Sequence, residues 1–160
     1  MILQTSQDTV KEDLLSYMIM PRYGKNLEDF FEKQKCKVSN NTILEIALGT
    51  LDMLESVHAA GYAYNDLKLD NIMVGFKNKL PRDYKEENVL ADASLHLVDF
   101  GFATRFIDKT TGLHIEEDEV STFRGNMIFG SLNQLNFMTT SRRDDLISLC
   151  YMTIYMLNNG

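Results

Sequence analysis

One stretch of the sequence repeats apolar residues at three- and four-residue steps, which places them on one face of an α-helix. The repeat runs from Ile43 to Val57 after possible N-caps at Ser39–Asn41, and Gly61 supplies the stop signal that commonly follows a helix. A second stretch, Leu146–Leu157, is almost continuously apolar and is too short to span a membrane. We predict a long amphipathic helix in the first stretch and a buried helix in the second.

Shorter patterns lie ahead of the long helix. Leu14–Met20 is a brief apolar run that stops at Pro21, which predicts a strand. Asn26 can cap a short helix that carries Leu27 and two phenylalanines on one face. We therefore expect a strand, a connector over residues 21–25 and a short helix before the long one.

Two brief apolar strands follow the long helix, at residues 72–74 and 95–98. They bracket a charged segment, 76–93, which we expect to be an exposed insertion in a long-looped hairpin. From residue 102 to residue 136 the sequence has little periodicity and is rich in Thr, Asp, Glu and Gly. An irregular segment of that length in a compact domain is usually either functional or disordered.

The composition narrows the class of protein. The chain has 160 residues, 44% of them hydrophobic and 24% charged, which suits one globular domain and excludes disorder throughout. Its 16 Lys and Arg residues against 23 Asp and Glu residues give a net charge of −7. Nucleic-acid binding through a general basic surface is therefore not expected.

The N-terminal sequence and the cysteines indicate in which cellular compartment the protein is expected. The sequence does not begin with a basic segment followed by an apolar stretch, so no secretory signal is expected, and no apolar run is long enough for a membrane span. The cysteines Cys36 and Cys150 cannot form a disulfide framework and lack the spacing of metal ligands. A reducing compartment suits them, so we expect an intracellular protein, cytoplasmic or nuclear, without a membrane partner.

The candidate chemistry lies in two polar turns. The segment 64–71, Y-N-D-L-K-L-D-N, follows the predicted long helix, and D-F-G at 99–101 follows the second brief strand. The first segment fits the pattern H-R-D-L-x-x-x-N at its Asp, Leu and Asn, but has Tyr and Asn at the first two positions. The alternative interpretation is that both motifs are turns that match these patterns by chance and have no chemical role. Two motifs in the right order, each beside a predicted strand, favour the chemical interpretation.

These residue types suit phosphoryl transfer. Mg²⁺ takes oxygen ligands, which the amide of Asn71 and the carboxylate of Asp99 supply. A second carboxylate, here Asp66, can orient the attacking hydroxyl and accept its proton. Lys68, two residues further on, can stabilise charge on the transferred group.

With these motifs the sequence resembles the eukaryotic protein kinases, and within them the casein kinase I and vaccinia-related kinase branch. N-L-E-D-F-F at 26–31 is similar to S-L-E-D-L-F of casein kinase I, and G-S-L-N at 130–133 is similar to its A-S-I-N. S-R-R-D-D-L at 141–146 matches that family letter for letter, and F-R-G at 123–125 resembles the vaccinia-related branch. The resemblance implies an α+β, protein-kinase-like fold with a mostly helical large lobe and a short β-hairpin.

The resemblance also implies roles for single residues. Asp66 would be the catalytic base, Lys68 the lysine that contacts the phosphate, and Asn71 and Asp99 the magnesium ligands. The other implied positions are Met20 at the back of the adenine pocket, Pro21 and Tyr23 in the hinge, Met73 on the floor of the pocket, and Gly101 and Asp145 as structural supports. Asp145 would accept hydrogen bonds from the backbone of the 64–71 loop.

By the same resemblance, residues 1–20 would end the small lobe, 21–25 would be the hinge, and 26–160 would be a portion of the large lobe. That portion would include the insertion at 76–93 and an activation segment over 99–133. The sequence contains no G-x-G-x-x-G, and the family's strand lysine and helix glutamate are not matched. The resemblance therefore implies an incomplete kinase domain whose small lobe is largely missing.

Two departures concern regulation and substrate choice. Asn65 stands where many kinases have the arginine that receives a phosphate on the activation segment, which makes phosphorylation there a weaker candidate for a switch. Ile128 stands where casein kinase I has an arginine on which its preference for already phosphorylated substrates partly rests.

The resemblance implies an ATP- and Mg²⁺-dependent serine/threonine kinase of casein kinase I type that acts on protein substrates. The expected serine/threonine specificity rests on Lys68 and on the branch. A catalytically silent, kinase-like binding scaffold is the alternative. The intact Asp66, Asn71 and Asp99 favour the enzyme, whereas the absent Gly-rich loop and strand lysine favour the scaffold, so we expect weak activity at most from these 160 residues alone.

Overall fold

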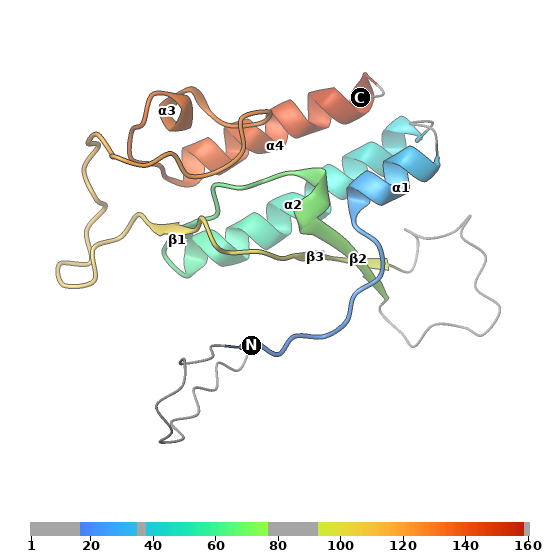
Figure 1. Cartoon of the computed structure of the whole chain (residues 1–160), viewed down its shortest axis with the longest axis horizontal. Helices are drawn as coiled ribbons and strands as arrows, with labels where there is room; N and C mark the ends of the chain where they lie inside the picture. Colours follow the sequence, from blue (N-terminus) through green and yellow to red (C-terminus); the bar gives the residue numbers. More distant parts are fainter. Residues whose placement is uncertain (1–16, 35–37, 77–92, 159–160) are drawn as a thin grey trace, which may run out of the picture.

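The computed structural model describes residues 17–34, 38–76 and 93–158, which form a mixed arrangement of helices and short antiparallel strands (Figure 1). The α+β class expected from the sequence is confirmed. In chain order the elements are α1 (Leu27–Lys33), α2 (Asn40–Ala59), β1 (Tyr62–Ala63), a 3₁₀ turn (Leu69–Asn71), β2 (Ile72–Phe76), β3 (Ala93–Leu97), β4 (Thr104–Arg105), α3 (Leu132–Leu135) and α4 (Arg142–Leu157).

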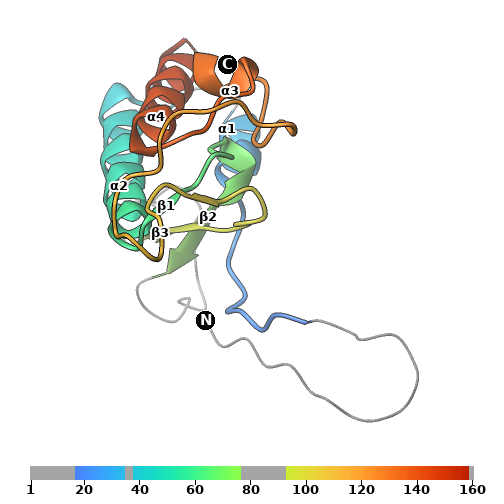
Figure 2. The ribbon, with the colours of Figure 1, turned by 90° about the vertical axis from the view of Figure 1, so that its left-hand side faces the viewer.

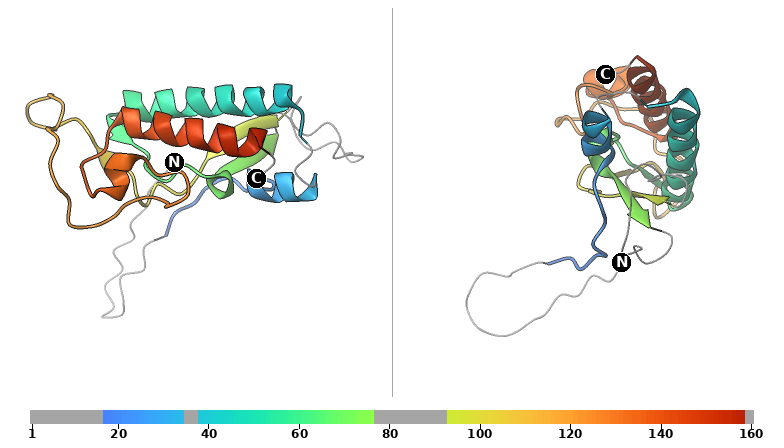
Figure 3. Two further views of the ribbon diagram at one scale, coloured as in Figure 1. Left: turned by 90° about the horizontal axis from the view of Figure 1, so that it is seen from above. Right: turned by 90° about the vertical axis from the view of Figure 1, so that its right-hand side faces the viewer.

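The helices α2 and α4 form the body of the molecule and lie side by side, as the view from above shows (Figure 3). Each presents an apolar face to the shared core, because residues three or four apart lie on one side of a helix. The buried apolar residues of the pair are Ile43, Ile46 and Leu54 from α2 and Leu149, Met152 and Met156 from α4.

The β2–β3 hairpin contacts α2 and completes this core. Its strands pair antiparallel, with Ile72 opposite Leu97, and the side chains of Ile72 and Val74 are buried. The connector before α1 joins the hairpin, since Gly24 N–H donates to Val74 O at 3.0 Å and Val74 N–H donates to Lys25 O at 2.8 Å. A second pair of very short strands, β1 and β4, lies next to the end of α2.

The helix starts follow local rules that can be read from the sequence. Asn26 caps α1 by accepting from Asp29 N–H at 2.8 Å, and Ser39 caps α2 by accepting from Thr42 N–H at 3.2 Å. Both α3 and α4 begin with reciprocal capping boxes, Ser131 with Gln134 and Ser141 with Asp144. Each capping bond satisfies a backbone donor that the first helical turn leaves free.

The segment between β4 and α3 is irregular, as expected. It forms the gold-to-orange loop that extends past one end of the paired helices in Figure 1, on the side that faces the viewer in Figure 2. Isolated bridges fasten the loop at two points, between Ile107 and His114 and between Glu119 and Met138. The loop is therefore held by scattered backbone pairs instead of a continuous sheet.

The predicted 14–20 strand lies partly outside the described residues. Its described part, 17–20, forms no continuous strand: Ile19 takes part in a single isolated bridge, and the four residues are 43–65% exposed. The expectation of a buried helix at 146–157 is wrong in part. The helix α4 is not buried all round, because Tyr151 and Ile154 on its outer side are 47% and 55% exposed. The predicted 76–93 insertion lies almost wholly outside the described residues. Within those residues, no helix is both long and apolar enough to cross a membrane.

The core can be tested on α2 with one buried and one exposed leucine. Leu54 is 0% exposed, so Leu54→Ala should lower the free energy of unfolding by about 2–5 kcal/mol through lost burial and a cavity. The matched change Leu48→Ala, at a side chain that is 62% exposed, should change it by less than about 0.5 kcal/mol. Urea denaturation measures both, and equal losses would contradict the packing described.

Candidate functional site

The loop between β1 and β2 carries the candidate chemistry and is buried along most of its length. Polar side chains inside a protein need hydrogen-bond partners, because leaving one unpaired costs about 1–3 kcal/mol. The buried polar residues of the loop are Tyr64 at 0% exposure, Asn65 and Asp66 at 1%, and Asn71 at 6%. The contacts of these four side chains define the site.

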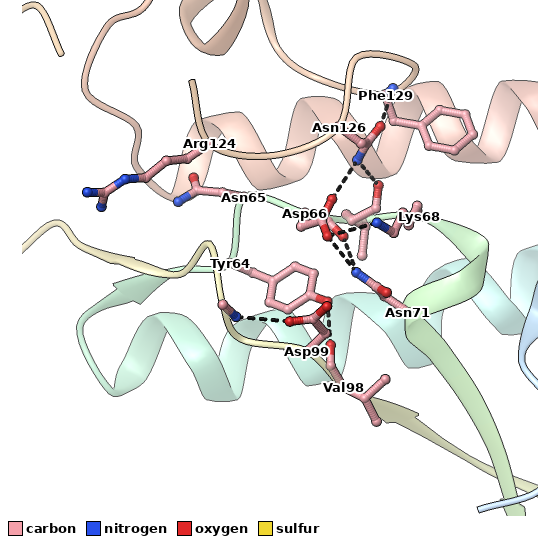
Figure 4. A network of polar contacts seen from close by, with 12 residues as sticks. Tyr64, Asn65, Asp66, Lys68, Asn71, Val98, Asp99, Arg124, Asn126 and Phe129 are labelled. Carbon is pink, nitrogen blue, oxygen red and sulfur yellow. Dashed lines mark hydrogen bonds and ion pairs between the residues drawn. The ribbon is translucent and has the colours of Figure 1, made fainter. Parts of the chain in front are cut away.

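Asp66 is the centre of the site (Figure 4). Its Oδ2 accepts from Lys68 Nζ at 3.0 Å and from Asn71 Nδ2 at 2.8 Å, and its backbone carbonyl accepts from the same Asn71 nitrogen at 3.0 Å. The 3₁₀ turn at Leu69–Asn71 folds Asn71 back toward Asp66. Three residues that the sequence singled out thus form one connected network.

Asp145, in the first turn of α4, accepts hydrogen bonds from the backbone of the 64–71 loop. Its side chain is fully buried, and its two oxygens accept the Tyr64 and Asn65 N–H groups, each at 2.7 Å. His58 Nε2, near the end of α2, lies 2.7 Å from Asp145 Oδ2 and donates to it. A carboxylate at the start of a helix is also stabilised by the helix dipole. This is the contact with the loop backbone that the resemblance implied for Asp145.

Tyr64 connects the loop to the D-F-G turn. Its hydroxyl donates to Val98 O at 2.6 Å, and its ring packs edge-on against Phe100 with 5.3 Å between centroids. Val98 N–H in turn donates to Asn71 O at 3.0 Å. Asp99 lies between Val98 and Phe100, so these contacts bring it to the Asp66 network, where Figure 4 shows it.

The D-F-G turn has an unusual backbone. Asp99 has φ of 56°, in the left-handed region that Asp tolerates better than most residues. Its Oδ1 accepts Gly101 N–H at 3.1 Å, and a Cβ at position 101 would stand 3.1 Å from that same oxygen. Glycine at position 101 therefore avoids a close contact between a Cβ atom and the Asp99 carboxylate.

The electrostatic environment of the site shifts the pKa of the Tyr64 phenol. Burial raises the pKa of its phenol well above the ordinary value of 10.0, and the negative charges of Asp66, Asp99 and Asp145 raise it further, against an opposing hydrogen bond with Asn71. The phenol therefore remains a hydrogen-bond donor at neutral pH. The three carboxylates act on one hydroxyl because they surround the same loop.

The donor set at this place suits a hard cation. Among the described residues, no group of three or more His, Cys, Asp or Glu side chains could hold a metal ion alone. Asn71 and Asp99 supply one amide and one carboxylate, both with oxygen donors, and Asp99 is exposed. Mg²⁺ is typically bound by one or two such groups together with water and phosphate oxygens, so these residues fit it.

The residues expected at the adenine pocket are only partly brought together. Tyr23 stacks on His96 with 4.4 Å between ring centroids, and Met73 lies opposite His96 in the hairpin. Met20, by contrast, is 44% exposed, and Pro21 is exposed as well. A cavity of about 520 Å³ lies elsewhere, along residues 104–143, and none of the expected site residues lines it.

The contacts that three residues make at the site were not anticipated from the sequence. Asn65 adopts φ of 72° and donates from Nδ2 to Phe102 O and Thr104 Oγ1, both at 2.8 Å. Gln134 Nε2 donates to Asn65 O at 2.8 Å, and the capping-box spacing Ser131 to Gln134 was the signal that could have placed this side chain. Asn126 lies in the irregular segment, where no periodic pattern marks it, and donates to Leu67 O in the 64–71 loop at 2.9 Å.

The fold agrees with comparisons to known proteins. The family model of the protein kinase domain matches residues 2–159, so this chain belongs to the protein kinase domain family. The chain is 31% identical over 150 residues to casein kinase I homolog 3 of Schizosaccharomyces pombe and 30% identical over 147 residues to casein kinase I homolog 1 of Saccharomyces cerevisiae. These matches cover 94% and 92% of this chain but only 32% and 26% of the two relatives. The resemblance that the motifs carried is confirmed.

Because Asp145 anchors the loop, we expect neutralisation of its charge to lower the free energy of unfolding substantially. Asp145→Asn keeps the shape but places an amide N–H₂ group among three donors, so the free energy of unfolding should fall by about 3 kcal/mol. Asp52→Asn, on the exposed side of α2, is the control and should change it by less than about 0.5 kcal/mol. Chemical denaturation decides, and equal values for the two variants would refute the anchor.

The raised pKa of Tyr64 predicts a loss of stability in alkali. The unfolded phenol ionises near pH 10, whereas the folded one stays protonated, so its contribution is complete below about pH 10 and is lost as the pH rises toward the folded pKa. The stability advantage of the wild type over Tyr64→Phe should therefore shrink between pH 9 and pH 11. Tyr151→Phe, at an exposed ring, is the control. A constant advantage across this range would contradict the burial argument.

Proposed function

We propose that this chain carries the catalytic loop of a protein serine/threonine kinase of casein kinase I type, which transfers the γ-phosphoryl group of ATP to hydroxyl groups of protein substrates. The observation that carries the proposal is the Asp66 carboxylate, 1% exposed, held by Lys68 and Asn71 beside Asp99. Such an arrangement supplies a proton acceptor, a cation and two oxygen ligands in one place. ATP as the donor points to the cytoplasm or the nucleus.

Each side chain has a distinct part in the transfer. Asp66 orients the substrate hydroxyl and accepts its proton as the oxygen–phosphorus bond forms. The bond between the γ-phosphorus and the bridging oxygen breaks, and ADP leaves. Lys68, whose ammonium lies 3.0 Å from Asp66 Oδ2 and whose side chain is 31% exposed, balances charge on the transferred group.

Asn71 and Asp99 would hold Mg²⁺, which neutralises phosphate oxygens when it is bound. Asn71 is suited to this because its nitrogen is engaged by Asp66, which fixes the direction of its amide. Tyr23 and Met73 lie together at His96, where the adenine base would be received. Gly101 and Asp145 act through the backbone, by placing the two turns.

A binding scaffold without turnover is the second candidate, and one observation favours it. Met20 and Pro21, which would enclose the adenine base, are exposed. A scaffold would use the same fold to bind a protein and would need neither nucleotide nor metal. Turnover separates the two candidates.

The proposal predicts phosphate transfer from ATP to serine- and threonine-containing peptides in the presence of Mg²⁺. Asp66→Asn should lower the rate about 10²–10⁴-fold, as expected for loss of a general base. Asp99→Ala should abolish the Mg²⁺ dependence of nucleotide binding. Asp70→Asn, at an exposed neighbour in the same loop, is the matched control and should keep the rate.

Radiolabelled ATP measures transfer, and calorimetric titration measures nucleotide binding. Equal rates for the wild type and Asp66→Asn would sink the catalytic assignment. Retained protein binding with no transfer by the wild type would favour the scaffold. A preference for tyrosine peptides would refute the serine/threonine specificity.

A further inference from the structure

The β2–β3 hairpin has an outer face that the apolar core does not use. Side chains along a strand point alternately to opposite sides, and the inner face of β2 carries the buried residues Ile72 and Val74. The outer face consists of the residues that alternate with these and of their partners in the register: Met73, Gly75, Ser94 and His96. The ring of Tyr23, in the connector before α1, lies against this outer face because it stacks on His96.

The imidazole ring of His96 is held by three neighbours. Tyr23 stacks on it, with 4.4 Å between ring centroids and 26° between the ring planes. Ser94 Oγ lies 2.7 Å from His96 Nε2, within hydrogen-bond distance. A Cβ at position 75 would stand 2.6 Å from both Cδ2 and Nε2 of the same ring. Glycine at position 75 therefore leaves the space that the His96 ring occupies.

The position of Tyr23 depends on this ring. Backbone hydrogen bonds tie the connector to β2 from Gly24 onward, since Gly24 N–H donates to Val74 O at 3.0 Å. Residues 21 and 22 are exposed, and no hydrogen bond to another described residue holds Tyr23 itself. The stack on His96 therefore fixes the connector one residue beyond its last backbone bond to the hairpin.

A fixed Tyr23 presents a backbone donor in a fixed place. Within the described part of the chain, no carbonyl accepts the Tyr23 N–H, so this donor is available to a ligand. A donor that is already held binds an acceptor more tightly than one that must be ordered on binding, because ordering costs conformational entropy. Met73, on the same outer face, has a flexible apolar side chain that suits the flat surface of a purine.

We propose that His96 is a positioning residue for the nucleotide: its ring holds Tyr23 so that the Tyr23 backbone N–H is in place for an acceptor atom of the adenine base. The inference rests on the proposed kinase function and concerns the base end of ATP alone. His96 touches Tyr23 and neither the phosphates nor the Asp66 network, so it should affect binding of the base without affecting binding of the phosphates.

The experiment titrates the full chain calorimetrically with three probes: adenosine, Mg–ATP and inorganic tripolyphosphate with Mg²⁺. His96→Ala removes one ring of the stack, so the dissociation constants for adenosine and Mg–ATP should rise about three- to tenfold, the range expected for one aromatic pair. The constant for tripolyphosphate, which has no base, should stay within about twofold. A variant that had lost its fold would instead bind all three probes more weakly.

Three further variants separate the stack from other effects. His96→Phe keeps a ring over Gly75 and should bind adenosine within about twofold of the wild type. Tyr23→Ala removes the other ring and should weaken adenosine binding as His96→Ala does, and it provides the test if His96→Ala fails to fold. The double variant should be no weaker than either single variant, because residues in contact do not act additively. His114→Ala, at an exposed histidine in the irregular segment, is the matched control and should bind all probes normally.

The outcomes distinguish the two proposals. Unchanged adenosine binding in His96→Ala, equal weakening for tripolyphosphate, or a wild type that does not bind adenosine would overturn the inference about His96. Adenosine binding that depends on His96 in a wild type that transfers no phosphate would defeat the proposed kinase function, while the role of His96 in placing the base would stand.

Discussion

The site depends on one buried carboxylate. Asp145 lies in the first turn of α4, and it accepts the backbone N–H groups of Tyr64 and Asn65, about 80 residues earlier in the chain. A loop that is buried needs partners for its backbone, and this carboxylate provides two of them together with a contact to His58. The pairing of α2 with α4 brings these groups together, so the geometry of the loop depends on the packing of the two helices.

A second set of bonds places the D-F-G turn against this loop. Tyr64 stands where the common kinase pattern has a histidine, and its hydroxyl reaches the carbonyl of Val98 directly before Asp99. The larger side chain also packs on Phe100, so one residue makes both a polar and an apolar connection. The irregular segment joins at the far side, where Gln134 and Asn126 donate to backbone carbonyls of the loop. Three stretches far apart in sequence thus meet at Asp66.

Much of the fold could be predicted from local patterns. The caps Asn26 and Ser39, the periodic face of α2 and the two strands of the hairpin all appear where the sequence indicated. The described part of the predicted 14–20 strand, residues 17–20, is exposed and shows a single bridge at Ile19, because an apolar run forms a continuous strand only where a neighbouring strand pairs along it. The prediction that α4 is buried was wrong for its outer side, because a continuous apolar run does not indicate which face of the helix packs.

The sequence by itself determined the residue types of the site and their order, since Asp66, Lys68, Asn71 and Asp99 fall in two short motifs whose spacing is local. Tertiary structure alone decided that the Tyr64 hydroxyl binds the carbonyl of Val98, that the Asn65 amide donates to the carbonyl of Phe102 and that Asn126 stands beside one oxygen of Asp66. The physical reason is that hydrogen bonds between buried groups depend on which backbone atoms packing leaves without partners. No periodicity or spacing records that information.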